Sequence, residues 1–221
     1  MPRQKGTDPS TQVIDAVLEL LTAHGYDEVQ LREVARRAHV SLATVYKLFP
    51  TRDELIVTAV EQWMASNTYA DLTPPPPGGT LRESLMGLCR TVFEPWERHP
   101  RMLEAYHRAR SGPGGHRLDT QGVTAVFPIA RDVLAGADPV YLADVALILT
   151  NVTYTLIGRF AEGTLAITEI LPAIERVIFR LTTDNEPDAR AAGRASGGGE
   201  GGLDPSLAAP FYHPDTAPDP G

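Results

Sequence analysis

The chain has 221 residues, of which 43% are hydrophobic and 22% are charged, and its formal net charge is -8. This composition is typical of a globular protein with one large or two small domains, and the negative charge argues against a protein that coats nucleic acid regardless of sequence. A single cysteine excludes an intrachain disulfide, and a polar N-terminus without any bilayer-length apolar run in the chain predicts a cytoplasmic protein with no membrane contact.

The first predicted helix begins at Asp8-Pro9, because aspartate is a good capping residue and proline is favoured at the first helical position. Its apolar residues recur at helical spacing and form one stripe, made of Val13, Ile14, Val17, Leu18 and Leu21. Gly25 is expected to end this helix in a left-handed conformation.

Two short helices joined by a tight turn are predicted next. The first has its apolar residues three and four apart, at Leu31, Val34, Ala35 and Ala38. The second repeats this spacing with Leu42, Val45 and Phe49. Ser41 in the turn can cap the second helix by accepting a hydrogen bond from the amide of Thr44. Neither helix can bury a core alone, and about four residues join them, so the pair indicates a helix-turn-helix.

The outward face of the second short helix suits DNA. With its apolar side inward, the helix exposes Ala43, Thr44, Tyr46 and Lys47. Small residues let the helix end approach base edges, and the three larger side chains can donate to phosphate oxygens. Five cations add local positive charge: Arg32, Arg36, Arg37, Lys47 and Arg52. The same face also fits the solvent side of an ordinary helical hairpin.

This part of the chain closely resembles the DNA-binding domain of TetR-family repressors, in register and without a gap over about residues 10–60. The resemblance is carried by Gly25-Tyr26, Leu31-Arg32-Glu33-Val34-Ala35, the run from Val40 to Pro50, and Arg52-Asp53-Glu54-Leu55. It implies a three-helix DNA-binding head on a helical ligand-binding and dimerising body. Two departures are Leu48, where the family often has histidine or tyrosine, and Val29-Gln30, where a serine or threonine usually caps the helix.

The residues predicted to bind DNA are Arg32, Ser41, Leu42, Ala43, Thr44, Tyr46, Lys47 and Arg52. One recognition helix reads only a few base pairs, whereas two related by a twofold axis read half-sites about 34–36 Å apart. The expected partners are therefore double-stranded DNA with a palindromic operator and a second copy of the chain.

The chain is predicted to be all-α, since no segment shows sustained strand alternation. We divide it into a head (1–52), a connecting helix (53–72) opened by a capping box at Thr51–Glu54, a Pro/Gly linker (73–79), a body (80–184) and a disordered tail (185–221). Body helices are expected at 81–96, after His99-Pro100, at 118–134, at 140–160 and at 168–181.

The expected helix 140–160 is apolar nearly all round, which indicates burial on more than one side. It is either the central helix of a monomeric core or a helix that also meets its copy in a second subunit. The TetR resemblance implies the second, with the last two helices forming a dimer interface.

Aromatic, sulfur-containing and amide side chains of the body are candidates for a pocket that takes a small apolar ligand. They are Met86, Phe93, Trp96, Met102, Tyr106, Phe127, Asn151 and Tyr154. Asn151 and Tyr154 would fix the polar end of the ligand, although core packing explains each apolar residue equally well. The run from Glu97 to Tyr106 and the pair Val29-Gln30 are similar to the steroid-catabolism regulators of actinobacteria, which implies a steroid or its acyl-CoA thioester.

No pattern of an enzyme is present. The six histidines do not cluster at metal spacing, and Cys89 lies on an apolar helix without an adjacent base. The glycine loop Ser111–Gly115 lacks the Gly-Lys-Ser/Thr of a phosphate site. We therefore expect no catalytic residue, metal or cofactor, and predict a dimeric repressor released from its operator by a ligand. The alternative is a helical adaptor without sequence-specific DNA binding.

Overall fold

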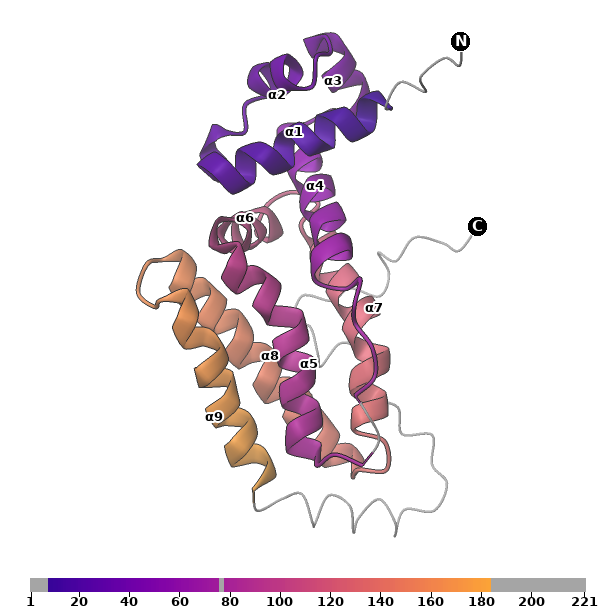
Figure 1. Cartoon of the computed structure of the whole chain (residues 1–221), viewed down its shortest axis with the longest axis vertical. Helices are drawn as coiled ribbons and strands as arrows, with labels where there is room; N and C mark the ends of the chain where they lie inside the picture. The colour runs from indigo at the N-terminus through magenta and orange to yellow at the C-terminus, as the bar shows by residue number, and fades with distance from the viewer. Residues whose placement is uncertain (1–7, 76–77, 184–221) are drawn as a thin grey trace. The chain divides into compact units, whose positions relative to one another are not determined.

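The computed structural model describes residues 8–75 and 78–183, and all regular structure in these residues is helical. The predicted disordered tail lies outside them. Figure 1 shows the described helices in chain order, which confirms the all-α prediction. They are α1 (Pro9–His24), the 3-10 helix η1 (Tyr26–Glu28), α2 (Leu31–Arg37), α3 (Leu42–Leu48), α4 (Arg52–Asn67), α5 (Leu81–Arg98), α6 (Pro100–Arg110), α7 (His116–Val133), α8 (Pro139–Ala161), the 3-10 helix η2 (Ile167–Glu169) and α9 (Ile170–Thr182).

Contacts within the chain define two compact units. Among the described residues, the first unit comprises 8–66 and 99–118, and the second comprises the remainder. Helix α6 therefore belongs with the helix-turn-helix, and it packs against α1 and η1. The sequence prediction placed α6 in the body because the helix follows the Pro/Gly linker at 73–79. Periodicity identifies the apolar face of a helix but not the helix that covers that face.

Helix α1 supports the helix-turn-helix through a stripe of buried side chains. The buried residues are Val13, Ile14, Ala16, Val17, Leu20 and Leu21, while Leu18 is half-buried. The helix begins at Pro9 as predicted, but the Asp8 side chain makes no capping hydrogen bond. Gly25 ends it with φ 89° and ψ -179°. This conformation has a positive φ but lies outside the left-handed helical region, and essentially only glycine adopts it.

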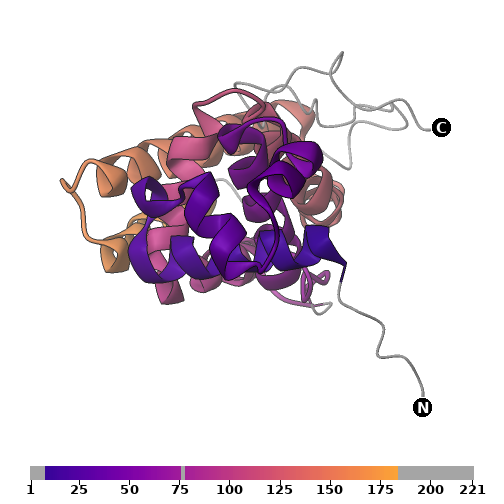
Figure 2. The same ribbon diagram turned by 90° about the horizontal axis from the view of Figure 1, so that it is seen from above.

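Helices α2 and α3 pack on each other, and α2 packs on α1; Figure 2 shows these helices as one group from above. The side chains buried between them are Val34, Ala35, Ala38, Val45 and Phe49. The turn places His39 at φ 53°, a conformation that costs a non-glycine residue about 1–2 kcal/mol. Burial of the Phe49 side chain alone contributes about 1.5–3 kcal/mol, so packing outweighs the strain of the turn.

Helix α4 completes the core of the first unit. The Thr51 hydroxyl caps it by accepting from the amide of Glu54 at 3.1 Å, as the capping box predicts. The expected apolar face is buried through Leu55, Ile56, Ala59, Val60, Trp63 and Met64. The Trp63 indole also meets the His99 imidazole edge to face, with ring centroids 5.7 Å apart. This contact joins α4 to the residue that precedes α6.

The second unit is built around α9, which lies beside α5 and α8 (Figure 1). Its buried residues recur every fourth position, at Ile170, Ile174 and Ile178. On its α5 side, the Arg82 guanidinium lies 4.6 Å from the centroid of the Phe179 ring. One turn earlier on α9, Glu175 pairs with Arg90 at 3.4 Å. Apolar burial thus holds α9, and these two exposed cations add contacts at the edge of the interface.

Helix α8 is 23 residues long, and the Asp138 side chain caps its start. Of its side chains only Val145, Leu156 and Ile157 are buried. Its apolar surface is exposed instead at Val140 (69%), Leu147 (48%) and Ile148 (37%). By length and composition this helix could cross a membrane, with a mean hydropathy of 1.6, so the prediction that the chain lacks such a run was wrong. A single helix of this kind is weak support for a span, because the core helix of a soluble protein passes the same test.

Candidate nucleic-acid interface

The N-terminus of α3 is capped as the sequence predicts. The Ser41 hydroxyl accepts a hydrogen bond from the Thr44 amide at 3.0 Å. The Ser41 and Thr44 hydroxyls are also 2.8 Å apart and share a hydrogen bond. This cap satisfies one of the unpaired amides at the start of the helix and fixes the direction in which α3 begins.

Helix α3 separates into a packed face and an open face. Val45 and the following Phe49 are buried, and Leu42 is half-buried. The open face carries the exposed residues Ala43, Tyr46 and Lys47 together with the half-buried Thr44. Tyr46 is 51% exposed, which is high for a large aromatic residue. A phenol and an ammonium beside one capped helix end can donate to phosphate oxygens.

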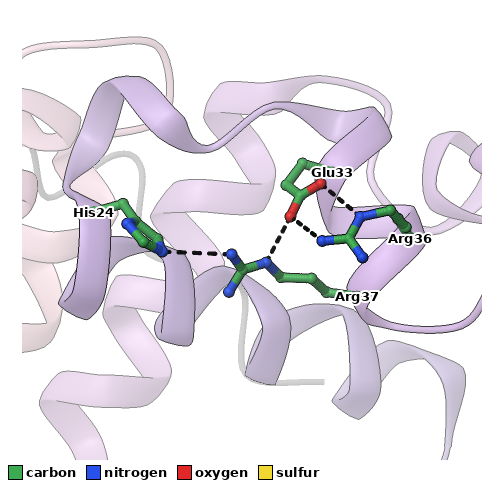
Figure 3. Close-up of polar contacts among 4 residues, drawn as sticks. All are labelled: His24, Glu33, Arg36 and Arg37. Atoms are coloured by element: carbon green, nitrogen blue, oxygen red, sulfur yellow. Dashed lines mark hydrogen bonds and ion pairs between the residues drawn. The ribbon is translucent and has the colours of Figure 1, made fainter.

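Helix α2 carries a charge cluster that reduces the basic character of this surface. Figure 3 shows Glu33 between two arginines. The Glu33 carboxylate accepts from Arg36 at 2.6 and 2.8 Å and from Arg37 at 2.8 Å. The Arg37 guanidinium also lies 3.4 Å from the His24 Nε2 atom at the end of α1, a hydrogen bond that requires a neutral imidazole accepting at Nε2. Hydrogen bonds from Arg36 first, and then from Arg37, lower the pKa of Glu33 from 4.5 to about 2.

This shift predicts how stability depends on pH. A carboxylate with a lowered pKa stabilises the folded state above its unfolded pKa and loses that contribution as pH falls through the folded pKa. For Glu33 the window runs from pH 4.5 down to about 2. We expect Glu33→Gln to lower the thermal unfolding midpoint at pH 6, with the difference from the unaltered chain shrinking toward pH 2. Glu19→Gln, at an exposed position of α1, is the control; a constant difference for Glu33→Gln would contradict the assignment.

Arg52, which the sequence predicts to contact DNA, is engaged by residues of its own unit. Its guanidinium donates to the Val29 carbonyl at 2.6 Å and to the Tyr26 carbonyl at 2.5 Å. It also lies 4.6 Å from the centroid of the Tyr26 ring. Both partners are more than twenty residues away in the chain, so no local pattern could reveal them.

Two cations of the predicted basic set keep an open side chain. Arg36 and Arg37 are engaged by Glu33, and Arg52 is engaged by backbone carbonyls. Arg32 of α2 and Lys47 of α3 are exposed, and neither has an ion-pair or hydrogen-bond partner within residues 8–75 and 78–183. The three- and four-residue spacing of Glu33 to the two arginines was the signal that could have found this pairing.

The predicted ligand-binding residues fall into both units. Met102 and Tyr106 are buried in the first unit on α6, whereas sequence reasoning grouped them with the body. The second unit contains Met86, Phe93 and Trp96, which are buried, and Phe127, Asn151 and Tyr154. The first three have the burial of ordinary core residues, so their burial alone does not define a ligand site.

The two polar candidates of α8 differ from each other. Asn151 is exposed, not buried as predicted, and its amide donates to the Leu147 carbonyl at 2.8 Å. The Tyr154 hydroxyl donates to the carboxylate of Asp119 at 3.0 Å. Asp119 is only 3% exposed, and sequence reasoning missed it because nothing local marks a carboxylate as buried. Burial, with Tyr154 and Asp119 close by, raises the pKa of the Tyr69 phenol in this cluster.

Two family models match the chain. The model of the bacterial regulatory proteins of the tetR family matches residues 13–59, which include α2, α3 and the cap of α3. The model described as the tetracyclin repressor-like C-terminal domain matches residues 78–181. The chain belongs to the TetR family. This confirms the resemblance carried by the helix-turn-helix residues, and it identifies a family of transcriptional regulators instead of enzymes.

Curated relatives of this TetR-family chain match it over part of its length. It is 32% identical over 98 residues to the HTH-type transcriptional repressor KstR of Rhodococcus jostii, a match that covers 44% of this chain and 45% of that protein. It is 33% identical over 102 residues to KstR of Mycolicibacterium smegmatis, covering 44% and 48%. The chain therefore spans about half the length of the curated relatives it matches.

Solved structures extend the likeness in fold. A TetR transcriptional regulator from Rhodococcus sp. RHA1 superposes with a TM-score of 0.59 at 20% identity, covering 79% of this chain and 97% of that one. A TetR-like regulator from the same source gives 0.57 at 17%, covering 82% and 100%. At these identities the likeness concerns the fold, and it agrees with the all-α architecture of a TetR-family protein.

Proposed function

We propose that the chain is a transcriptional repressor that binds a palindromic operator through α3. The observation that carries the proposal is the open face of α3, where Tyr46 and Lys47 are exposed beside a helix start capped by Ser41. In the proposed complex this helix enters the major groove, while Lys47 and Arg32 contact phosphates. Residues 1–52 bind DNA, and the body helices of residues 80–184 other than α6 bind the ligand and a second copy.

Selection of bound duplexes from a random library, followed by titration of the recovered sequence, tests this proposal. A twofold-symmetric sequence with half-sites one helical turn apart is the expected result. Absence of any enriched sequence would instead favour a helical adaptor that uses the helix-turn-helix as a scaffold.

The second partner in the proposal is another copy of the chain. It is supported by the exposed apolar residues Leu147 and Ile148 in the middle of α8, which a twofold-related α8 would cover. The same arrangement accounts for the hydropathy of α8 in a cytoplasmic protein. Dimerisation also gives the operator its expected symmetry.

The third part of the proposal is release from the operator by an apolar ligand bound in the second unit. Support comes from the resemblance of Glu97–Tyr106 to the steroid-catabolism regulators of actinobacteria, which points to a steroid or its acyl-CoA thioester. The ligand lowers operator affinity by its differential affinity for the free and DNA-bound conformations.

Thermal-shift titration tests the ligand class. A panel of sterols, steroid acyl-CoA thioesters and fatty acyl-CoA thioesters should contain a compound that raises the unfolding midpoint. At a concentration of about 100 times its Kd, this compound should stabilise the folded chain by about 2.7 kcal/mol. The same compound should weaken binding to the selected duplex. A flat response across the whole panel would remove the steroid and acyl-CoA assignment and leave the DNA-binding proposal standing.

A further inference from the structure

Residues 22–29 lead into the helix-turn-helix. Three arginines from outside the helix-turn-helix donate hydrogen bonds to this segment. Arg52 comes from the start of α4, and Arg101 and Arg108 come from α6. Arg101 and Arg108 are seven residues apart and lie on the same face of α6, which packs on α1 and η1. We call these residues, with Tyr26 and Asp27 at their centre, the arginine clamp. All its members belong to the first unit.

Arg108 makes the most specific contacts of the clamp. Its two terminal nitrogens donate to the two carboxylate oxygens of Asp27, each at 2.7 Å. Its guanidinium carbon also lies 4.2 Å from the centroid of the Tyr26 ring. A planar guanidinium can satisfy both partners at once, whereas a lysine ammonium cannot reproduce the two parallel hydrogen bonds. The hydrogen bond from Arg108 lowers the pKa of Asp27, so the pair is fully charged near neutral pH.

The other two arginines hold the same segment by its backbone. Arg52 bonds the carbonyls of Tyr26 and Val29, and its guanidinium carbon lies over the Tyr26 ring, so this ring is contacted by two cations from two helices. Arg101 donates to the carbonyls of Thr22 and Ala23 near the end of α1. A cation at the C-terminal end of a helix also interacts favourably with the helix dipole.

We propose that the arginine clamp positions α2 and α3 for DNA, and that Arg108 of α6 is therefore a positioning residue for operator binding. Helix α2 begins at Leu31, three residues after η1 ends at Glu28, so the clamped segment sets where α2 starts. Because α2 and α3 are packed together, a shift of α2 carries the recognition face with it. Operator affinity then depends on α6, a helix that carries no predicted DNA contact.

This inference rests on the proposed operator binding, and Arg108→Ala tests it. The probe is the duplex selected from a random library with the unaltered chain. We expect operator affinity to fall about fivefold, the combined effect of a partly exposed charge pair and a cation–π contact. The thermal midpoint should fall by no more than about 2–4 °C, so the variant stays folded in the assay. The operator affinity of Arg108→Lys should lie between those of Arg108→Ala and the unaltered chain.

The salt dependence of binding separates positioning from direct contact. If Arg108 touched a phosphate, its removal would reduce the slope of log affinity against log salt by about 0.9 for each copy in the complex. A positioning residue leaves this slope unchanged while the affinity falls. Arg90→Ala is the matched control. It removes the ion pair between Arg90 and Glu175 of the second unit, which is also partly exposed and has a similar sequence separation. It should leave both affinity and slope unchanged.

A coupling test addresses the pair itself. Asp27→Ala combined with Arg108→Ala should bind DNA no more weakly than the weaker single variant, and exchange of the two residues by Asp27→Arg with Arg108→Asp should restore part of the affinity. Asp27→Asn keeps the shape of the site and serves if Arg108→Ala fails to fold. Unchanged affinity in a folded Arg108→Ala or Asp27→Asn variant, or a reduced salt slope for Arg108→Ala, would overturn the inference.

Amide hydrogen exchange without DNA distinguishes failure of the clamp from failure of the proposed function. If the unaltered chain selects no sequence, the proposed function fails, and exchange over residues 26–48 then decides the clamp alone. We expect Arg108→Ala to exchange these amides faster than the unaltered chain and Arg90→Ala to match it. Equal exchange in all three proteins would overturn the positioning role.

Discussion

Replacement of Lys47 by alanine is expected to lower the affinity for the selected duplex by about tenfold at physiological salt. The side chain is exposed on the open face of α3 and has no ion-pair or hydrogen-bond partner among the described residues, so its charge is available to a phosphate. Each phosphate contact releases counterions, and a dimer carries two copies of Lys47. The slope of log affinity against log salt should therefore fall by roughly 1.8. Fluorescence anisotropy at four salt concentrations measures both quantities.

One control removes a cation elsewhere on the chain, and further variants change the Tyr46 phenol beside Lys47. Arg131→Ala removes one exposed cation from α7 in the second unit, which leaves the net charge the same as in Lys47→Ala. It should change neither affinity nor slope. Tyr46→Ala should weaken binding, while Tyr46→Phe separates the contribution of the hydroxyl from that of the ring. Unchanged affinity in both Lys47→Ala and Tyr46→Ala, with folded protein, would show that the recognition face is misassigned.

Local patterns predicted the architecture of the helix-turn-helix because its determinants are close in sequence. The three- and four-residue spacing identified Val45 and Phe49 as core residues, and both are buried. The Ser41 cap depends on an amide three residues away, and that hydrogen bond is present. The same kind of signal failed at Asp8. Helix α1 begins at Pro9 as predicted, but the Asp8 side chain does not cap it.

Contacts between distant residues were beyond this reasoning. Arg52 and Arg108 look like surface cations in the sequence, yet both are bound to the η1 segment across more than twenty residues. The same limit placed Met102 and Tyr106 in the ligand-binding body, whereas α6 packs in the unit of the helix-turn-helix. Periodicity gives the apolar face of a helix, and only the fold decides which neighbour covers it.

Helix α8 was expected to be buried on more than one side, either in a monomeric core or against its copy in a second subunit. The single chain covers little of it. After Pro139, its exposed residues recur at helical spacing and form one stripe: Val140, Asp144, Leu147, Ile148, Asn151, Thr155 and Arg159. The stripe is apolar near its middle and charged toward Asp144 and Arg159. A surface of this kind suits a partner with the same pattern in reverse, which a twofold axis near Asn151 supplies.

Substitution of Ile148 by glutamate is expected to raise the dissociation constant of the proposed dimer by at least about 100-fold. The side chain is 37% exposed in the single chain, so the monomer accepts a charge there at little cost. In the dimer both copies would bury an unpaired carboxylate, which costs several kcal/mol. Light scattering during size exclusion should give twice the chain mass of 24.0 kDa for the unaltered protein and the monomer mass for the variant. The operator affinity of the variant should also fall, since the single head of a monomer reads only half of a palindrome.

The charged ends of the stripe provide a second, independent measurement. In a twofold arrangement centred near Asn151, Asp144 of one copy lies near Arg159 of the other, so each pair occurs twice. Asp144→Arg should weaken the dimer by placing like charges together, and the added change Arg159→Asp should restore it. Thr124→Glu adds a charge at an exposed position of α7 and should leave the mass unchanged. A dimeric Ile148→Glu variant would move the interface away from α8, and failure of the Asp144–Arg159 exchange to restore the dimer would reject the register while keeping the helix.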